Sequence, residues 1–268
     1  MIVDKINAFL NDEGKAINEA ILTEVAQLAR YSFDRQFGKR DKHAKTLRLS
    51  SIGKCVRQQA YNILGFEENG KEIDARAKMV FFQGDLTELA IVILAKAAGC
   101  NLSKTGLEQM TIKIEGIEGH PDGIINKDTL LEVKSMSSYS FENFQNQQID
   151  ESYHYQCNGY MHALGLEQTC IVGLNKDAGV LHEWIIKKDQ TIVDDIIRRI
   201  GSLRTVTPDT LPDRPYEPNA KGFLPWQCLY CGFWKTCWPQ ATRVLVSNRY
   251  KLKTDENTSD ASYVRSAQ

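Results

Sequence analysis

Residues 119–135 read GHPDGIINKDTLLEVKS, a stretch in which turn residues separate two runs of strand-forming residues. The runs at 123–125 and 129–134 predict two strands, and residues 126–128 predict a hairpin turn between them. Alternate residues of a strand point to the same side, so Glu132 and Lys134 share one face. Asp122 precedes the first strand, and the hairpin can bring it to Glu132 on that face. The stretch therefore predicts a sheet that gathers two acids and one lysine.

These three side chains suit the hydrolysis of a phosphodiester bond. Two carboxylates are hard oxygen ligands for Mg²⁺ or Mn²⁺. Such an ion lowers the pKa of a bound water, neutralises charge on the phosphate and orients both. Lys134 could orient or deprotonate the attacking water and stabilise the developing negative charge. An ordinary cross-strand ion pair is the simpler explanation, because common charged residues at loose spacing often occur by chance.

The rest of the chain predicts a mixed α/β fold. Helical periodicity indicates helices over residues 1–37 (one or two), 50–64, 75–98, 151–164 and 190–203, and strand patterns indicate strands over 110–115, 169–174 and 181–186. This order predicts a restriction-endonuclease-like core, with a central mixed sheet of about five strands flanked by helices. We expect an N-terminal helical region at 1–48, a catalytic domain at 49–240 and a disordered polar tail at 251–268.

Composition and charge restrict where the protein works and how it finds a partner. No run of about 18 uncharged apolar residues occurs, and the first residues mix acids and bases, so we expect a cytoplasmic protein without a membrane span or signal peptide. The formal net charge of the 268 residues is -1, so DNA would have to be attracted by local basic patches. The most basic window is 35–48, where Arg40, Lys42 and Lys45 are candidate DNA contacts. A solvated loop is the alternative interpretation of this window.

Cysteine spacing predicts a metal site. A reducing compartment disfavours disulfides, and the pattern Cys228-x-x-Cys231-x5-Cys237 is typical of metal ligands. This pattern is one ligand short of a tetrahedral site, and Cys55 is the best candidate to complete it from far along the chain. Such a site would join the N-terminal and C-terminal parts. The other three cysteines are expected to be buried thiols: Cys100, Cys157 and Cys170.

Several motifs together resemble the RecB-like branch of the PD-(D/E)xK nuclease superfamily. Pro121-Asp122 is similar to the first acidic position of that family, residues 132–134 (EVK) to its core motif, and Gln156 with Tyr160 to its Gln-x-x-x-Tyr helix. The resemblance implies that Gln156 holds Lys134 or DNA and that Tyr160 contacts DNA. Without the other motifs, these two residues would be a surface glutamine and a partly buried tyrosine.

Residues 82–88 (FQGDLTE) resemble the Gly-x-x-x-(Glu/His) helix of the same family, which supplies a further metal ligand. The resemblance implies Glu88 as that ligand, and Asp85 is the substitute if the helix is rotated. His120 is either a phosphate contact or an ordinary turn histidine.

The segment SSIGKCVRQQAY at 50–61 resembles the region of the first cysteine in RecB-like iron-sulfur exonucleases, including those of CRISPR adaptation and the AddB subunit. The resemblance implies a [4Fe-4S] cluster on Cys55, Cys228, Cys231 and Cys237, and Arg57 is a further candidate DNA contact. Zinc also suits four thiolates. Five aromatic residues crowd the late cysteines and could form either the dry shell of a cluster or a small core: Trp226, Tyr230, Phe233, Trp234 and Trp238.

The expected function is that of a Mg²⁺- or Mn²⁺-dependent DNA exonuclease. By resemblance it would act on single-stranded ends, in recombination, repair or CRISPR-type processing, with possible protein partners in such a complex. One alternative is a catalytically silent DNA-binding or assembly subunit, in which the carboxylates are structural. Another is a sequence-specific endonuclease, which would cut circular DNA at fixed positions.

Overall fold

A computed structural model describes residues 1–38, 47–69 and 74–255 of the chain. The chain divides into two compact units, which we call the sheet unit and the cysteine unit. The sheet unit comprises Met1–His43, Arg48–Gly53 and Asp74–Ile197, and the cysteine unit comprises Ala44–Leu47, Lys54–Ile73 and Arg198–Gln268. The two units do not follow the expected ranges: most of the expected N-terminal region belongs with the sheet, and the cysteine segments form a unit of their own.

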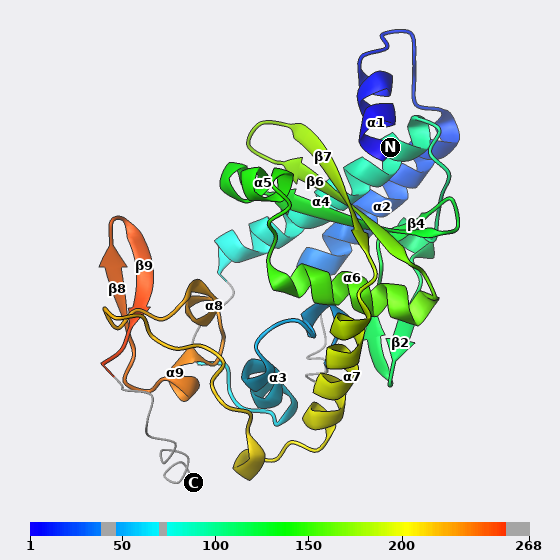
Figure 1. Ribbon diagram of the computed structural model, residues 1–268. Helices are drawn as coiled ribbons and strands as arrows, with labels where there is room; N and C mark the ends of the chain where they lie inside the picture. The colour runs from blue at the N-terminus through cyan, green and yellow to red at the C-terminus, as the bar shows by residue number, and fades with distance from the viewer. Residues whose placement is uncertain (39–46, 70–73, 256–268) are drawn as a thin grey trace. The chain divides into compact units, whose positions relative to one another are not determined.

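The sheet unit is built on a mixed five-stranded sheet, as the sequence predicted (Figure 1). Its strands, in spatial order, are β1 (Leu102–Ser103), β4 (Gly123–Ile125), β5 (Thr129–Met136), β6 (Gln168–Asn175) and β7 (Val180–Lys187). The pair β4 and β5 forms the predicted antiparallel hairpin, β5 and β6 are parallel, and β6 and β7 are antiparallel. A parallel pair needs a long crossover connection, and helices α5 (Ser138–Gln145) and α6 (Glu151–Leu164) supply it.

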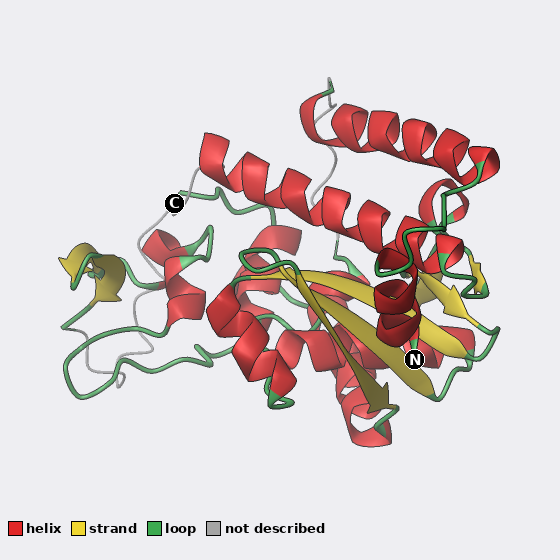
Figure 2. Ribbon diagram, turned by 90° about the horizontal axis from the view of Figure 1, so that it is seen from above, coloured by secondary structure: helices red, strands yellow, loops and turns green. Residues whose placement is uncertain are grey.

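Helices cover both sides of this sheet (Figure 2). On one side, α1 (Ile2–Leu10) and α4 (Ala75–Ala97) bury apolar side chains against Leu131, Val133 and Val172. Strand alternation turns Glu132 and Lys134 to the other side, where α6 contacts β5 and β6. Helix α2 (Glu19–Phe37) packs along α4, with the Phe33 ring edge-on to Phe82 at 4.6 Å between ring centroids.

The region before β4 differs from the prediction. A two-stranded hairpin of β2 (Ile112–Ile114) and β3 (Ile117–Gly119) turns at Glu115 and Gly116, which both have positive φ. The single strand expected over 110–115 is therefore one arm of a hairpin. The short pieces of 3-10 helix in this unit are η1 (Leu49–Ser51) and η2 (Gly106–Glu108).

The cysteine unit consists of short elements around a small core. They are α3 (Val56–Ile63), η3 (Pro208–Thr210), α8 (Trp226–Leu229), α9 (Trp234–Cys237), β8 (Thr242–Val246) and β9 (Arg249–Lys253), and α7 (Gln190–Arg204) leads into the unit from the sheet unit. The core joins Leu224 and Cys228 to Trp234, Trp238 and Leu252.

Two expectations are wrong in the cysteine unit. The helix expected from Ser50 begins at Val56, because residues 49–51 form a 3-10 turn and Cys55 takes the N-cap position. Residues 251–253, which were expected to be disordered, pair with β8, because Leu252 is fully buried in the small core. Residues 256–268 of the expected tail lie outside the described part of the chain.

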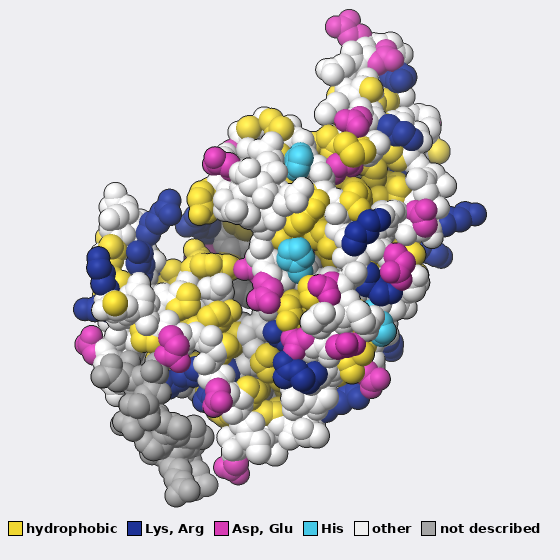
Figure 3. Space-filling model, in the orientation of Figure 1, with side chains coloured by type: hydrophobic (Ala, Val, Ile, Leu, Met, Phe, Trp, Pro, Cys, Tyr) yellow, Lys and Arg dark blue, Asp and Glu magenta, His cyan; other side chains and the backbone are white. Residues whose placement is uncertain are grey.

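Within the described ranges, no helix is both long enough and apolar enough to cross a bilayer. Acidic and basic side chains are interspersed over the face drawn in Figure 3, which agrees with a net charge near zero.

Candidate active site and cysteine site

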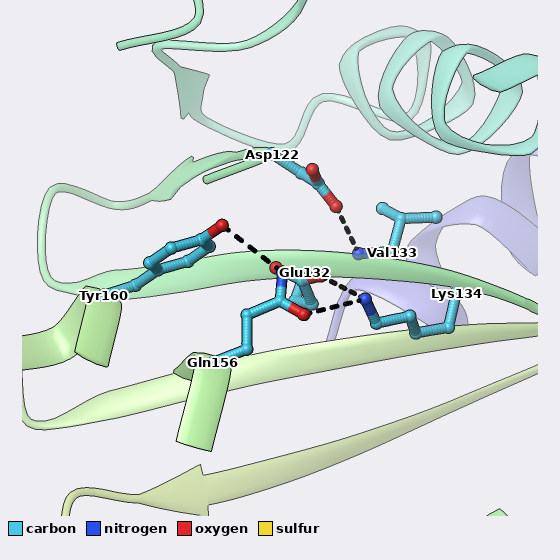
Figure 4. A network of polar contacts seen from close by, with 6 residues as sticks. All are labelled: Asp122, Glu132, Val133, Lys134, Gln156 and Tyr160. Atoms are coloured by element: carbon cyan, nitrogen blue, oxygen red, sulfur yellow. Dashed lines mark hydrogen bonds and ion pairs between the residues drawn. The ribbon is translucent and has the colours of Figure 1, made fainter. Parts of the chain in front are cut away.

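A buried polar network lies between β5 and α6 (Figure 4). Lys134 Nζ is 2.5 Å from Glu132 Oε1 and 3.3 Å from Gln156 Oε1. The Gln156 amide nitrogen donates to Glu132 Oε1 at 2.8 Å and lies 3.5 Å from the Tyr160 hydroxyl. Glu132 is 2% exposed and Tyr160 is 1% exposed. The structure thus brings together four of the residues that the sequence singled out. Strand alternation turns Glu132 and Lys134 toward α6, and helical spacing turns Gln156 and Tyr160 toward β5.

Asp122 lies at the end of β4, next to this network. The hairpin register pairs Gly123 with Leu131, so Asp122 is the next residue opposite Glu132. Its carboxylate accepts a hydrogen bond of 2.7 Å from the backbone N–H of Val133, and it reaches β5 across the strand from Gln156 (Figure 4). The sequence predicted that Asp122 shares the face of Glu132, whereas the structure turns its carboxylate toward the backbone of β5.

The pKa of Asp122 responds to the other two candidate metal ligands. Burial raises the pKa of Asp122 well above its usual value, and the negative charges of Glu132 and Glu88 raise it further. The positive charge of Lys134 opposes this rise, as does the hydrogen bond from Val133. Asp122 therefore lies within electrostatic reach of both other candidate metal ligands.

Glu88 enters the site from α4. Burial raises its pKa to about 7, the guanidinium of Arg35 opposes the rise, and the charge of Glu132 adds to it. Asp85, the alternative ligand on this helix, is held by α2. It pairs with the guanidinium of Arg35 and accepts a hydrogen bond of 2.6 Å from Gln36. Of the two acids on α4, Glu88 is therefore the better placed to serve with Glu132.

Whether these acids fit a metal ion can be judged from their oxygen atoms. In the part of the chain that the structure describes, no group of three or more His, Cys, Asp or Glu side chains is already arranged to hold an ion. Nevertheless, Glu132 Oε2 is buried and has no hydrogen-bond partner among these residues. A buried acceptor without a donor is costly, and a cation would satisfy it. Oxygen donors from Glu88, Asp122 and Glu132 are the type that Mg²⁺ and Mn²⁺ prefer.

Tyr153 is a neighbour of Lys134 that sequence reasoning missed. Lys134 Nζ lies 4.6 Å from the centre of the Tyr153 ring. Tyr153, Gln156 and Tyr160 follow one another at spacings of three and four along α6. That spacing is visible in the sequence and could have pointed to Tyr153.

Of the candidate DNA contacts, the structure describes His120 but not the three residues of the basic window. His120 is exposed, with Nδ1 3.4 Å from the Thr111 hydroxyl, and it follows Gly119, whose backbone packs against the Tyr160 ring. It therefore lies beside the network at the surface. The three basic residues of the window at 35–48 lie outside the described residues: Arg40, Lys42 and Lys45.

The four predicted cysteine ligands line one pocket of the cysteine unit, together with Tyr61, Trp234 and Trp238: Cys55, Cys228, Cys231 and Cys237. Burial raises the pKa of Cys228 and of Cys231 to about 12, and the neighbouring thiols raise both further. The Cys55 sulfur also caps α3 by accepting a hydrogen bond of 3.5 Å from the Gln58 backbone. Four sulfur donors are of the type that zinc or an iron-sulfur cluster takes. Among the described residues, however, these thiols do not form a group already arranged to hold a metal.

Arg57 belongs to the surroundings of this pocket. Its guanidinium donates to the Tyr61 hydroxyl at 3.0 Å and to the Pro212 carbonyl at 2.5 Å. Burial raises the pKa of the Cys237 thiol, and Arg57, Arg214 and Tyr61 oppose this rise. These contacts place Arg57 at the cysteines, although the sequence suggested it as a DNA contact.

The aromatic shell is smaller than expected. Trp234 and Trp238 are buried and line the pocket, and Phe233 is buried beside them. Trp226 and Tyr230 are each 58% exposed and contact each other instead. Of the other cysteines, Cys157 and Cys170 are buried as expected, and Cys100 is half-buried.

No protein-family model matches the chain, and no curated protein matches it. Among solved structures, an alkaline exonuclease (LHK-Exo) from Laribacter hongkongensis aligns with a TM-score of 0.46 at 16% identity, over 65% of this chain and 90% of the exonuclease chain. The protein SSO0001 aligns with a TM-score of 0.46 at 18% identity, over 78% and 93% of the two chains. A phage-related exonuclease from Haemophilus somnus 129PT aligns with a TM-score of 0.41 at 17% identity, over 60% and 92%. At these TM-scores the function has to be argued from the site itself.

Proposed function

We propose that the sheet unit is the catalytic core of a Mg²⁺- or Mn²⁺-dependent DNA nuclease of the PD-(D/E)xK type. The observation that carries this proposal is the buried Glu132 side chain. One of its oxygens pairs with Lys134 and Gln156, and the other has no partner among the described residues. In a purely structural ion pair, a second buried oxygen without a donor would only cost free energy.

Each residue of the network has a role in this reaction. Glu88, Asp122 and Glu132 hold the ion, which when bound makes a water more acidic and offsets negative charge on the phosphate. Lys134 presents an ammonium beside Glu132, where it orients the attacking water and stabilises the developing charge. Gln156 fixes both Glu132 and Lys134 through its amide.

Tyr160 acts through Gln156 in this proposal. The family resemblance implied that it contacts DNA, but its ring is 1% exposed and its hydroxyl lies near the Gln156 amide. A buried tyrosine in that position orients its neighbour and does not reach a substrate.

The substrate is proposed to be DNA with free ends, preferably single-stranded, as in recombination, repair or CRISPR-type processing. The test compares end-labelled linear strands with a covalently closed circle, in Mg²⁺, in Mn²⁺ and in EDTA. We expect metal-dependent shortening of the linear strands and no cutting of the circle. Lys134→Ala should abolish the shortening, and equal cleavage by this variant and the wild type would refute the proposal. Fixed cuts in the circle would select the endonuclease alternative.

Two observations support a second candidate function. Asp122 is engaged with the Val133 backbone, and no described set of side chains is already arranged around an ion. A DNA-binding subunit without catalysis would keep such an arrangement. Salt-dependent DNA binding without cleavage in either metal would select this alternative.

For the cysteine unit we propose a [4Fe-4S] cluster on Cys55, Cys228, Cys231 and Cys237. Support comes from the shared pocket and from the buried indoles of Trp234 and Trp238. A cluster there is structural, because its ligands come from α3 and from the segment of α8 and α9, far apart in the sequence.

The competing occupant of the four-cysteine site is zinc. Protein purified without oxygen should be brown, contain iron and sulfide, and lose colour in Cys231→Ser. The same substitution at Cys157, a buried thiol outside the pocket, should keep the colour. A colourless protein with one zinc per chain would overturn the cluster assignment.

A further inference from the structure

Tyr153 lies at the N-terminal end of the α6 face that carries Gln156 and Tyr160. Residues three and four apart on a helix project from the same side, so all three side chains of this face point toward β5. Lys134 Nζ lies 4.6 Å from the centre of the Tyr153 ring. Helix α6 therefore covers the ammonium with an aromatic ring as well as with an amide.

The contacts of Lys134 match the chemistry of an ammonium. A lysine ammonium has three N–H donors, and Lys134 has three neighbours: Glu132 Oε1, Gln156 Oε1 and the Tyr153 ring. Its side chain is 17% exposed, so these neighbours largely replace water around it. The negative face of an aromatic ring attracts a cation within about 6 Å, and the attraction strengthens when water is excluded. The ring thus contacts the part of the ammonium that the two oxygens do not contact.

We propose that Tyr153 is a positioning residue, whose ring face holds the Lys134 ammonium beside Glu132 in the orientation that phosphodiester hydrolysis needs. This inference rests on the proposed nuclease function. The four-carbon stem of lysine is flexible, so without the ring the ammonium can rotate away from Glu132. A misplacement of about 1 Å at a reacting group can lower a rate by about 100-fold.

The test changes the ring and leaves the network residues intact. Tyr153→Phe keeps the ring and should cleave at the wild-type rate. Tyr153→Leu should lower kcat by about tenfold with little change in KM, because the ring acts on the chemical step and not on DNA binding. Phenylalanines with one, two and three fluorines at position 153 should lower kcat stepwise, since each fluorine weakens the negative face of the ring with little change of volume. A flat fluorine series would overturn the proposal, because it would show that the ring only fills space.

A measurement without metal or substrate separates this proposal from the nuclease assignment. Protons held over an aromatic ring resonate upfield, so the methylene next to the Lys134 ammonium should be shifted upfield in lysine-labelled protein. The shift should persist in Tyr153→Phe and vanish in Tyr153→Leu, and an unchanged signal in Tyr153→Leu would overturn the contact. An active wild type with a dead Lys134→Ala and an unaffected Tyr153→Leu would overturn only the role of Tyr153. A wild type that cleaves nothing would overturn the nuclease and this role together.

Discussion

Gln156 joins the acid and the base of the proposed active site, because its amide contacts both Glu132 and Lys134. Gln156→Leu keeps the volume and removes these hydrogen bonds, so both charged groups lose a fixed partner. Residues that orient metal ligands typically contribute 10- to 100-fold to activity or metal affinity, and we expect a fall in kcat of about that size. Mg²⁺ titrations of the initial cleavage rate should also show weaker apparent binding of the ion.

The matched control for this variant is Gln145→Leu, because Gln145 is an exposed glutamine at the end of α5. It should cleave at the wild-type rate. If the two leucine variants cleaved equally well, the network around Glu132 would have no part in the reaction.

Individual residues of the site differ in how far the sequence could predict them. Glu132 and Lys134 share a face because strand alternation leaves no other arrangement, and the spacing of Gln156 and Tyr160 places both on one side of a helix. The orientation of Asp122 depends on a side-chain torsion and on the Val133 backbone N–H, which donates to it just before β4 begins. The spacing of Tyr153 places it on the same helix face as Gln156, but its distance from Lys134 depends on how closely α6 packs on β5, which no local pattern determines.

Two ion pairs join α2 to α4: Arg35 with Asp85, and Glu24 with Lys96 at 2.5 Å. The first of them is the more deeply buried at its acid. Asp85 is 9% exposed and pairs with Arg35, whose side chain is 40% exposed. Arg35→Ala leaves the Asp85 carboxylate buried with Gln36 as its remaining partner, and we expect the free energy of unfolding to fall by about 1–2 kcal/mol. Denaturant titration followed by circular dichroism measures the loss.

A second arginine of α2 provides the control for that measurement. Arg30 pairs with Asp34 at 4.0 Å, and the two side chains are 87% and 75% exposed. Water screens such a pair, so Arg30→Ala should change the free energy of unfolding by less than about 0.5 kcal/mol. Equal losses in the two variants would contradict a special role for the pair of Arg35 with Asp85.

Helix α3 carries two polar side chains that oppose the rise in the pKa of Cys237, namely Arg57 and Tyr61. If the pocket holds a cluster, these donors stabilise the added negative charge of its reduced form. Tyr61→Phe and Arg57→Lys should therefore lower the reduction potential by on the order of tens of millivolts, measured by voltammetry on anaerobic protein. Arg243→Lys, in β8 and away from the pocket, should leave the potential unchanged. If the reduction potential were unchanged in all three variants, Arg57 and Tyr61 would have no influence on it.

The long elements could be predicted because their periodicity extends over many residues. The expected helix at 151–164 matches α6, and the expected strands at 169–174 and 181–186 lie within β6 and β7. The three-residue strands β2 and β3 are too short for alternation to show, so a single strand was expected over 110–115. The start of α3 was also misplaced, because the helix expected from residue 50 begins at Val56, with Cys55 as its cap.

The charge of the whole molecule restricts how it can hold DNA. With a net charge of -1 and interspersed acids and bases on the face of Figure 3, the field of the protein offers little attraction over a distance. Under the proposed function, affinity for DNA has to come from a few local cations, and the basic window at 35–48 is the richest source in the sequence. Two interpretations of that window, a phosphate-contacting arm and a solvated loop, give different salt dependences.

The experiment that separates these interpretations measures DNA affinity against salt in the Lys134→Ala background, so that cleavage does not interfere. Each phosphate contact on a single strand contributes about -0.7 to the slope of log affinity against log salt. Replacing Arg40, Lys42 and Lys45 with alanine should make the slope less steep by about 2 if all three contact phosphates. A matched removal of three exposed lysines elsewhere, Lys5, Lys15 and Lys187, should leave the slope unchanged. If both triple variants keep the wild-type slope, the window is a solvated loop and the DNA is held by other cations.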